Sequence, residues 1–227
     1  MKKVLITGSK GNVGQILVNG LHNFHLLSVD LPEFDLRNYD LVSKLTRDKN
    51  AIIHLAWNTK TENGNAKKWD KDNTKMWMNV YNAALKNKVP RVIMASSVHA
   101  TDYESLSKQK LVSPREELNS PKVYGRHKRF LEKQGEKFSL NGLEVICVRL
   151  GGICGIDETP WEGLKIDGLA YPDMISLFTS CLDAKIIPDN YSVIYGVSKN
   201  GESVFDLSNP FNWEPQFNSA EFYGINA

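Results

Sequence analysis

The chain has 227 residues, enough for one large domain or two small ones with a sizeable hydrophobic core that needs no disulfide bonds. Hydrophobic residues make up 41% and charged residues 24%, a balance typical of globular proteins that excludes a disordered or collagen-like chain. The 28 Lys and Arg residues barely exceed the 26 Asp and Glu residues, so the chain lacks the concentrated positive charge that nucleic acids and anionic membranes attract. We therefore predict neither a nucleic-acid nor a membrane partner.

Several features of the sequence favour a cytoplasmic protein. No apolar run approaches the roughly 18 residues that span a bilayer, and the apolar stretch near Met1 is too short for a signal-peptide core. The three cysteines are odd in number and lack the Cys-x-x-Cys spacing. They predict reduced thiols rather than disulfides or a zinc site, and we expect no bound metal.

Short apolar runs alternate with longer amphipathic stretches over roughly the first 150 residues. The runs are rich in Val, Ile and Leu with little alternation, which is typical of parallel strands covered on both faces. Repeated strand–helix units of this length predict right-handed crossovers, and hence an α/β fold with a doubly wound parallel sheet of the Rossmann type. In chain order we expect strand 4–6, helix 12–21, strand 25–29, helix 38–48, strand 51–55, helix 69–87, strand 91–95, helix 122–140 and strand 144–149.

The pattern changes after residue 150. Glycines and a proline punctuate residues 151–168, which we expect to form a loop or flap. A helix at 173–184 and a strand at 191–197 follow, and the aromatic residues after Asn209 predict a packed tail. We therefore divide the chain into a first domain, 1–150, and a small lobe with a carboxyl-terminal tail, 151–227, integrated with it.

A glycine-rich segment, Thr7-Gly8-Ser9-Lys10-Gly11-Asn12-Val13-Gly14, lies between the first strand and the first helix. Glycines there permit a tight turn and let the backbone approach a pyrophosphate, whose charge the amino terminus of the helix stabilises. The spacing is Gly-x-x-Gly-x-x-Gly rather than the commoner Gly-x-Gly-x-x-Gly. Its place between a strand and a helix favours a dinucleotide site over a plain turn.

An acidic residue ends the second strand. Asp30 follows Gly8 by 22 residues, where a carboxylate accepts hydrogen bonds from both ribose hydroxyls of an adenosine. The same carboxylate repels a 2′-phosphate, and no arginine directly follows it. The sequence thus favours NAD over NADP, and the alternative for Asp30 is a surface turn before Pro32.

Residues of a proton relay occur later in the chain. The fourth strand leads into Ser96-Ser97-Val98-His99, at the edge of an open α/β sheet where ligands bind. Tyr124 and Lys128 are four residues apart, so they share one face of a helix. A cation beside a phenol lowers the Tyr pKa from about 10, which makes Tyr124 a candidate general base, with Ser97 to orient the substrate oxygen. Tyr-x-x-x-Lys alone is a frequent accident, and its alternative is an exposed helix face.

Taken together and in this order, the motifs resemble those of the extended short-chain dehydrogenase/reductases of the NAD-dependent epimerase/dehydratase type, over residues 1 to about 150. The resemblance implies a Rossmann domain that binds NAD, followed by a substrate-binding lobe. It implies that Tyr124 is the catalytic acid/base, that Lys128 holds the nicotinamide ribose and tunes Tyr124, and that Ser97 binds the reacting oxygen. It also implies that Asn73 supports the site, although a polar residue near a helix start explains Asn73 equally well.

The resemblance also implies the cofactor contacts. The glycine-rich segment, with Asn12 and Val13 at the start of the helix, would hold the pyrophosphate, while Asp35 and the backbone of Leu36 would contact the adenine. His54, within the third strand, is expected to be a hydrogen-bonded core residue instead. The path of the dinucleotide at the end of that strand would be lined by Leu55, Ala56 and Trp57.

Within this family the chain is most similar to the uronate dehydrogenases, which oxidise free sugar acids at C1 to the lactone. Only 99 residues follow Lys128, too few for a lobe that grips a nucleotide-sugar. The resemblance implies that Thr59 and His99 hydrogen-bond sugar hydroxyls. The full set of candidate substrate residues is Thr59, Ser97, Val98, His99, Gly152 and Lys165.

The resemblance is weaker in the loop that would meet a substrate carboxylate. Uronate dehydrogenases have a serine at the position of Gly152 and an arginine in the loop that follows. Here residues 154–171 contain no arginine, and Lys165 is the single cation among acidic residues. Lys165 is a candidate partner for a carboxylate, with a solvated lysine as its alternative. A neutral aldose or another small polyol is therefore an alternative substrate.

We expect an NAD-dependent oxidoreductase of a small free sugar or sugar acid. One alternative is an epimerase or dehydratase that keeps its NAD bound. Another is a non-catalytic NAD-sensing protein, against which the complete set of Ser97, Tyr124 and Lys128 argues. By analogy with the family, the helices at 69–87 and 122–140 pair across a homodimer.

Overall fold

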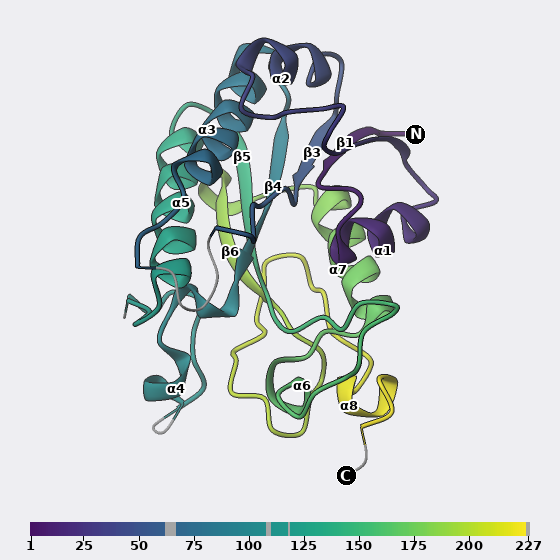
Figure 1. Cartoon of the computed structure of the whole chain (residues 1–227), viewed down its shortest axis with the longest axis vertical. Helices are drawn as coiled ribbons and strands as arrows, with labels where there is room; N and C mark the ends of the chain where they lie inside the picture. Colours follow the sequence, from purple (N-terminus) through teal and green to yellow (C-terminus); the bar gives the residue numbers. More distant parts are fainter. Residues whose placement is uncertain (62–66, 108–109, 118, 226–227) are drawn as a thin grey trace.

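The computed structural model describes residues 1–61, 67–107, 110–117 and 119–225. Six parallel strands form one sheet in the order β2-β1-β3-β4-β5-β6, with helices on both faces (Figure 1). The α/β fold predicted from the sequence, a doubly wound parallel sheet, is confirmed. The strands are β1 (Lys3–Thr7), β2 (His25–Val29), β3 (Ala51–His54), β4 (Arg91–Ser97), β5 (Glu144–Leu150) and β6 (Tyr191–Gly196).

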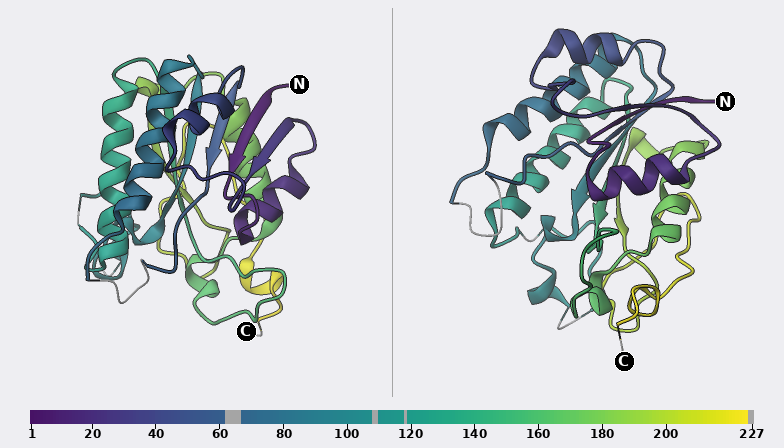
Figure 2. Two further views of the ribbon diagram at one scale, coloured as in Figure 1. Left: turned by 45° about the horizontal axis from the view of Figure 1, so that its top comes forward. Right: turned by 45° about the vertical axis from the view of Figure 1, so that its right-hand side comes forward.

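The helices form two layers and a group of short helices at one end. They are α1 (Asn12–Gly20), α2 (Tyr39–Leu45), α3 (Lys71–Lys86), α4 (Tyr103–Leu106), α5 (Val123–Ser139), α6 (Leu164–Asp167), α7 (Tyr171–Asp183), α8 (Ser219–Phe222) and the 3₁₀-helices η1 (Val98–Ala100) and η2 (Pro188–Asn190). Helices α1 and α7 cover one face of the sheet, and α3 and α5 cover the other (Figure 2). The short helices α4, α6 and α8 lie at the end of the molecule opposite α2 (Figure 1).

Strand side chains point alternately into two buried layers. In β1, Val4 and Ile6 pack in the layer of α1 and α7, whereas Leu5 packs in the layer of α3 and α5. In β5, Ile146 and Cys147 divide in the same way. Strands β1 and β5 are thus apolar on both faces over most of their length, which is why the sequence shows continuous apolar runs there instead of alternation.

The strand order creates the place for a ligand. From β1 the chain passes through α1 to β2 on one side, and from β3 it passes through α3 to β4 on the other side. Ligands of open α/β sheets bind outside the carboxyl ends of the strands at such a switch point. Thr7 and His54 end β1 and β3 as register partners, and Ser97 ends β4 beside them. The glycine-rich segment and residues 55–59 therefore meet at this edge.

The chain after residue 150 continues the same sheet and the same layers. Strand β6 pairs with β5, and α7 packs in the layer of α1. The segment expected to be a loop contains the short helix α6. The tail is packed as predicted at Trp213, which is buried and donates a hydrogen bond from Nε1 to Ser176 Oγ (2.9 Å).

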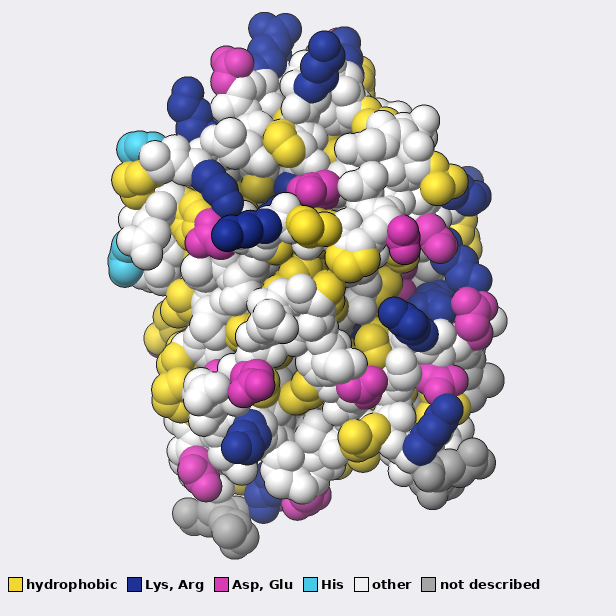
Figure 3. Space-filling view, turned by 180° about the vertical axis from the view of Figure 1, so that it is seen from behind, with side chains coloured by type: hydrophobic (Ala, Val, Ile, Leu, Met, Phe, Trp, Pro, Cys, Tyr) yellow, Lys and Arg dark blue, Asp and Glu magenta, His cyan; other side chains and the backbone are white. Residues whose placement is uncertain are grey.

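Further features of the described part of the chain concern its helices, its cysteines, possible metal ligands and its surface charge. No helix in it is both long and apolar enough to cross a membrane. Its cysteines, Cys147, Cys154 and Cys181, are buried free thiols, and no cluster of three or more His, Cys, Asp or Glu side chains within it is placed to hold a metal ion. On the face seen from behind, Lys and Arg side chains are interspersed with Asp and Glu (Figure 3).

Candidate active site

A cavity of about 490 Å³ opens at the switch point of the sheet. It brings together the glycine-rich segment, the end of β2 and the segment after β3. Three residues expected at the adenosine end, Asp30, Asp35 and Leu36, line this same cavity. The complete lining is Gly8, Lys10, Gly11, Asp30, Leu31, Phe34, Asp35, Leu36, Arg37, Leu55, Ala56, Trp57, Asn58, Thr59, Lys60, Asp72 and Met76.

The glycine-rich segment has the geometry of a pyrophosphate cradle. Gly8 has a φ of +73°, and a Cβ there would lie 2.6 Å from Ala56 N. A Cβ at Gly14 would lie 2.3 Å from Gly8 O, so Gly14 lets α1 pack directly beneath the turn. Gly11 caps α1 without a side-chain hydrogen bond, and the first turn carries no acidic residue. The N–H groups of that turn are thus left for an anion, and these residues fit the pyrophosphate of NAD.

The carboxylate of Asp30 is held by two backbone amides. Lys10 N donates to Oδ2 (2.8 Å), and Leu31 N donates to Oδ1 (2.7 Å). Because Asp30 directly follows β2 and lines the cavity, these bonds fix its carboxylate where the sequence predicted a ribose contact. Lys10 also lines the cavity, and its Nζ donates to Leu31 O (3.0 Å).

Sequence reasoning missed an arginine in this cavity. Arg37 follows Asp30 by seven residues and lines the same space. Its guanidinium donates to both oxygens of Asp35 and, through Nη1, to Asp72 Oδ2 (2.8 Å). The hydrogen bonds from Arg37 hold the pKa of Asp35 below its usual value. Two carboxylates therefore share the charge of Arg37.

A second cavity of about 470 Å³ adjoins the first and shares Leu55, Trp57 and Thr59 with it. The predicted Ser97, from β4, and Tyr124 and Lys128, from α5, all line it. The three side chains, separated by 31 positions in the sequence, thus converge on one space. The complete lining is Asn12, Val13, Leu55, Trp57, Thr59, Ala95, Ser96, Ser97, Tyr124, Lys128, Leu150, Gly151 and Ile153.

Lys128 is buried and fixed by two kinds of contact. Its Nζ donates to Ala95 O (2.8 Å) and lies 3.6 Å from the centroid of the Trp57 ring, a cation–π distance. The Tyr124 ring meets the same tryptophan edge-on, with centroids 5.7 Å apart. Trp57 therefore sets the spacing of the cation and the phenol, a role that the sequence alone did not reveal.

A buried ion pair ties α5 to the sheet one turn after Lys128. Arg149, from β5, donates to both carboxylate oxygens of Glu132 (2.9 and 2.8 Å), and Ser96 Oγ donates to Oε1 (2.5 Å). Burial alone would raise the pKa of Glu132, but Arg149 and Ser96 together hold it below its usual value. Sequence reasoning missed this pair. Two sequence features could have revealed it. Glu132 continues the spacing of four that relates Tyr124 and Lys128, and Arg149 lies within an otherwise apolar strand.

Asn73 and His54 are buried and lie outside both cavities. Asn73 Oδ1 accepts from Asn58 N (2.7 Å), and its Nδ2 donates to Asn58 O (3.3 Å), so it fixes the segment after β3. A hydrogen bond joins His54 Nδ1 and Thr7 Oγ1 (2.7 Å), whereas His54 Nε2 has no partner among the described residues. Burial, aided by the nearby charge of Lys128, lowers the pKa of His54 to about 3, so this histidine is neutral.

The predicted substrate residues Thr59, Val98 and His99 lie in different places relative to the two cavities. Thr59 lines both cavities. Val98 is buried beneath the site in a small apolar cluster. The ring of His99 packs on Tyr103 of α4, with centroids 5.7 Å apart, and burial lowers the His99 pKa. His99 is thus held at the margin of the cavity rather than in its lining.

The predicted substrate residues after β5, Gly152 and Lys165, are in the lining of neither cavity. Gly152 N donates to Asp167 O (3.0 Å), and Leu169 N donates to Gly152 O (2.8 Å), which joins this segment to the end of α6. Lys165 Nζ pairs with Glu162 (2.9 Å) and lines neither cavity. The candidate partner for a substrate carboxylate therefore already has an acidic partner.

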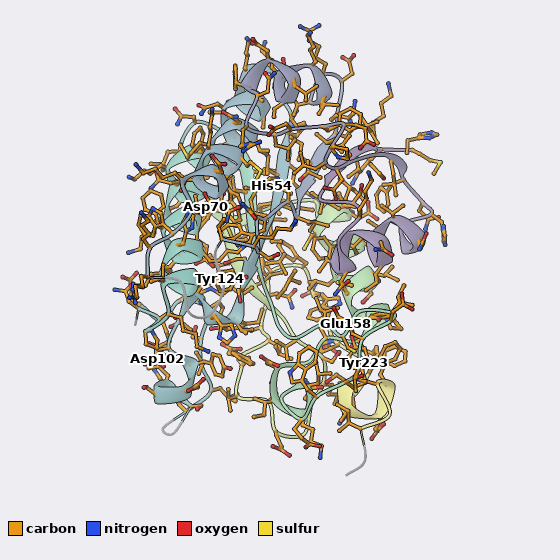
Figure 4. The ribbon with its side chains drawn as sticks, in the orientation of Figure 1. His54, Asp70, Asp102, Tyr124, Glu158 and Tyr223 are labelled. Carbon is orange, nitrogen blue, oxygen red and sulfur yellow. The ribbon has the colours of Figure 1, made fainter. Side chains whose placement is uncertain are left out.

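Glu158, in the loop after β5, lies to the right of Tyr124 in Figure 4 and is exposed. Asn12 Nδ2 donates to Glu158 Oε1 (3.0 Å), and Gly155 N donates to Oε2 (2.8 Å). The amide of Gly155 and the side chain of Asn12 lower the pKa of Glu158. This loop carboxylate thus lies beside the first residue of α1, at the pyrophosphate cradle.

Fold and site together define an α/β protein of the dinucleotide-binding type, with a serine, a tyrosine and a lysine lining a cavity that adjoins the one at the switch point. The model of the NAD dependent epimerase/dehydratase family matches residues 4–163, and the chain belongs to this family. NAD is accordingly its cofactor.

Individual relatives extend the similarity over most of the chain. The chain is 30% identical to the uncharacterized protein YtbQ of Bacillus subtilis, over 97% of this chain and 96% of that protein. It is 28% identical to the L-arabinose 1-dehydrogenase (NAD(P)(+)) of Haloferax volcanii, over 70% of each chain. A solved uronate dehydrogenase from Agrobacterium tumefaciens superposes with a TM-score of 0.79 at 21% identity, covering 99% of this chain and 88% of that one. At that identity the superposition shows the shared fold.

Proposed function

We propose that this protein oxidises a small free sugar at C1 to the lactone with NAD as the hydride acceptor. The observation that carries the proposal is the convergence of Ser97, Tyr124 and Lys128 on a cavity that adjoins the dinucleotide cavity. The relative named for arabinose and the neighbour named for uronate both support a small sugar as substrate. Residues 1–150 would bind NAD and carry the catalytic side chains, and residues 151–227 would bind the sugar.

In the proposed reaction Tyr124, Ser97 and Lys128 have different tasks. NAD, when bound, supplies the hydride acceptor. Tyr124 removes the proton from the C1 hydroxyl, while Ser97 donates a hydrogen bond to the same oxygen. Lys128 stabilises the phenolate of Tyr124 through its positive charge and holds the nicotinamide ribose.

Cofactor binding would use the first cavity. The free N–H groups at the start of α1, with Gly8 and Gly11 in the turn before it, would hold the pyrophosphate. Asp30 would accept hydrogen bonds from the ribose hydroxyls, and Asp35 and Leu36 would contact the adenine. Asn73 would support this arrangement through its two hydrogen bonds to Asn58.

The proposal is tested by following NADH at 340 nm with purified protein, NAD and a panel of neutral aldoses and uronates. We expect turnover with at least one sugar and a fall of about 10²–10⁴-fold in kcat for Tyr124→Phe, because general-base catalysis contributes that much. NAD binding measured by calorimetry should be unchanged in this variant. Tyr39→Phe, a change in α2 outside both cavities, is the matched control.

Two other outcomes would reject this reaction. Conversion of a sugar to a stereoisomer without net NADH would identify an epimerase. NAD binding without any turnover, together with no effect of Tyr124→Phe on any measured property, would identify an NAD-sensing protein.

A further inference from the structure

A carboxylate and an aromatic ring converge on Gly152, the residue next to the lining of the reactive cavity. Gly151 lines that cavity, and Gly152 follows it. A Cβ at Gly152 would lie 3.0 Å from Asp167 Oδ1 and 3.0 Å from Trp161 Cζ2. Because Gly152 has no side chain, these two groups and Leu164 pack directly against the backbone next to the site.

The carboxylate of Asp167 lacks a side-chain partner. It is half-buried at the end of α6, and among the described residues no side chain donates a hydrogen bond to it. Burial raises its pKa to about 6, against which the backbone amide of Gly152 and the nearby charge of Lys122 act. At neutral pH it is therefore an ionised acceptor with room for a donor.

The surroundings of Asp167 belong to the substrate end of the site. Lys122, the residue before α5, interacts electrostatically with both Asp167 and His99. Burial, and to a lesser degree the negative charge of Asp167, raises the pKa of Tyr103, which packs on His99. Asp167 thus lies within electrostatic range of Tyr103 and of Lys122, the residue before the helix that carries Tyr124.

Trp161 supplies the second half of a sugar site. Its side chain is 44% exposed, and its ring lies against Gly152 and Gly163. An exposed indole face packs on the C–H groups of a sugar ring, while a carboxylate accepts hydrogen bonds from the hydroxyls. A ligand with its own carboxylate would instead be repelled by the negative charge of Asp167. Lys165, the cation in this loop, is already paired with Glu162 (2.9 Å) and so does not offset that repulsion.

We propose that Asp167 and Trp161 form the specificity site for a neutral sugar, with Asp167 accepting a hydroxyl hydrogen bond and excluding sugar acids. This inference rests on the proposed function, since it names the substrate class of the same site.

The test compares pairs of sugars that differ only at C6, D-galactose with D-galacturonate and D-glucose with D-glucuronate. We expect the wild-type protein to favour the neutral member at least tenfold in kcat/KM. Asp167→Asn should lower this preference at least tenfold, mainly through KM. Trp161→Ala should raise KM for both members about equally, because stacking does not depend on the charge at C6. Asp157→Asn, which removes an exposed carboxylate from the same loop without touching Lys165, is the matched control.

Two results would overturn the inference: a wild-type preference for the uronate, or an Asp167→Asn variant that folds and keeps the wild-type ratio. Calorimetry of the same sugars with NADH-loaded Tyr124→Phe protein measures sugar binding without turnover. It therefore tests the role of Asp167 independently of the proposed reaction. Preferential binding of the neutral sugar without turnover in the wild type would support the role of Asp167 and reject the dehydrogenase. Binding of neither member of a pair would overturn the role of Asp167.

Discussion

The carbonyl oxygen of His99 lies directly against Gly125, where a Cβ would be 1.8 Å from it. Gly125 follows Tyr124 in the first turn of α5, and His99 follows Ser97 by two residues. The missing side chain thus lets the helix with the tyrosine approach the segment that carries the serine. This contact sets the separation of the two side chains that meet in the reactive cavity.

Gly125→Ala should push α5 away from the end of β4. We expect at least a tenfold loss in kcat/KM and a loss of about 1–3 kcal/mol in the free energy of unfolding, because the added methyl meets the backbone oxygen of His99 as well as the Ser120 side chain. Steady-state kinetics and urea unfolding measure the two effects. Gly201→Ala is the control, since a Cβ at Gly201 has nothing within 4 Å. Wild-type kinetics for Gly125→Ala would show that the contact does not set the site.

Asp30 should determine the choice between NAD and NADP. Asp30→Asn keeps the shape of the side chain but removes the charge that repels a 2′-phosphate, and Lys10 and Arg37 line the same cavity. We expect the preference for NAD over NADP in kcat/KM to fall at least tenfold. Asp48→Asn, an exposed change outside the cavity, should leave it unaltered. An unchanged preference in Asp30→Asn would mean that another group discriminates between the cofactors.

The ion pair of Glu132 and Arg149 should be essential for stability. Both side chains are fully buried, so Glu132→Gln leaves the charge of Arg149 uncompensated in the core. We expect a loss of about 3–5 kcal/mol in the free energy of unfolding, measured with urea. Asp183→Asn, which breaks the exposed pair with Lys2, should cost less than about 1 kcal/mol. Equal effects of the two changes would contradict a strong contribution of the buried Glu132–Arg149 pair to stability.

Asp167 should destabilise the folded protein once it ionises. Burial raises its pKa to about 6 in the folded chain, so its contribution to stability is present at low pH and is lost as the pH rises from about 4 through 6. Asp167→Asn should therefore match the wild type in Tm at pH 4 and exceed it by about 2–8 °C at pH 8. Asp157→Asn, an exposed change in the same loop, is the control. A lower Tm for Asp167→Asn at pH 8 would show that the carboxylate stabilises the fold.

The sequence was most informative where function depends on short-range geometry. The apolar runs predicted β1 to β6 because strands covered on both faces must be apolar throughout. Tyr124 and Lys128 could be paired because a spacing of four places side chains on one helix face. The glycine-rich segment predicted a dinucleotide cradle because its turn, between β1 and α1, is itself local.

The tertiary structure decided which distant groups border the site. Glu158 reaches Asn12 across 146 positions, Arg149 reaches Glu132 from another element, and Asp167 lies over Gly152. Each contact depends on how a long connection packs at the carboxyl edge of the sheet, and no periodicity encodes that path. The sequence by itself therefore determined the fold, the cofactor class and the candidate relay, because these follow from local rules. The surroundings of the substrate were decided only by long-range packing.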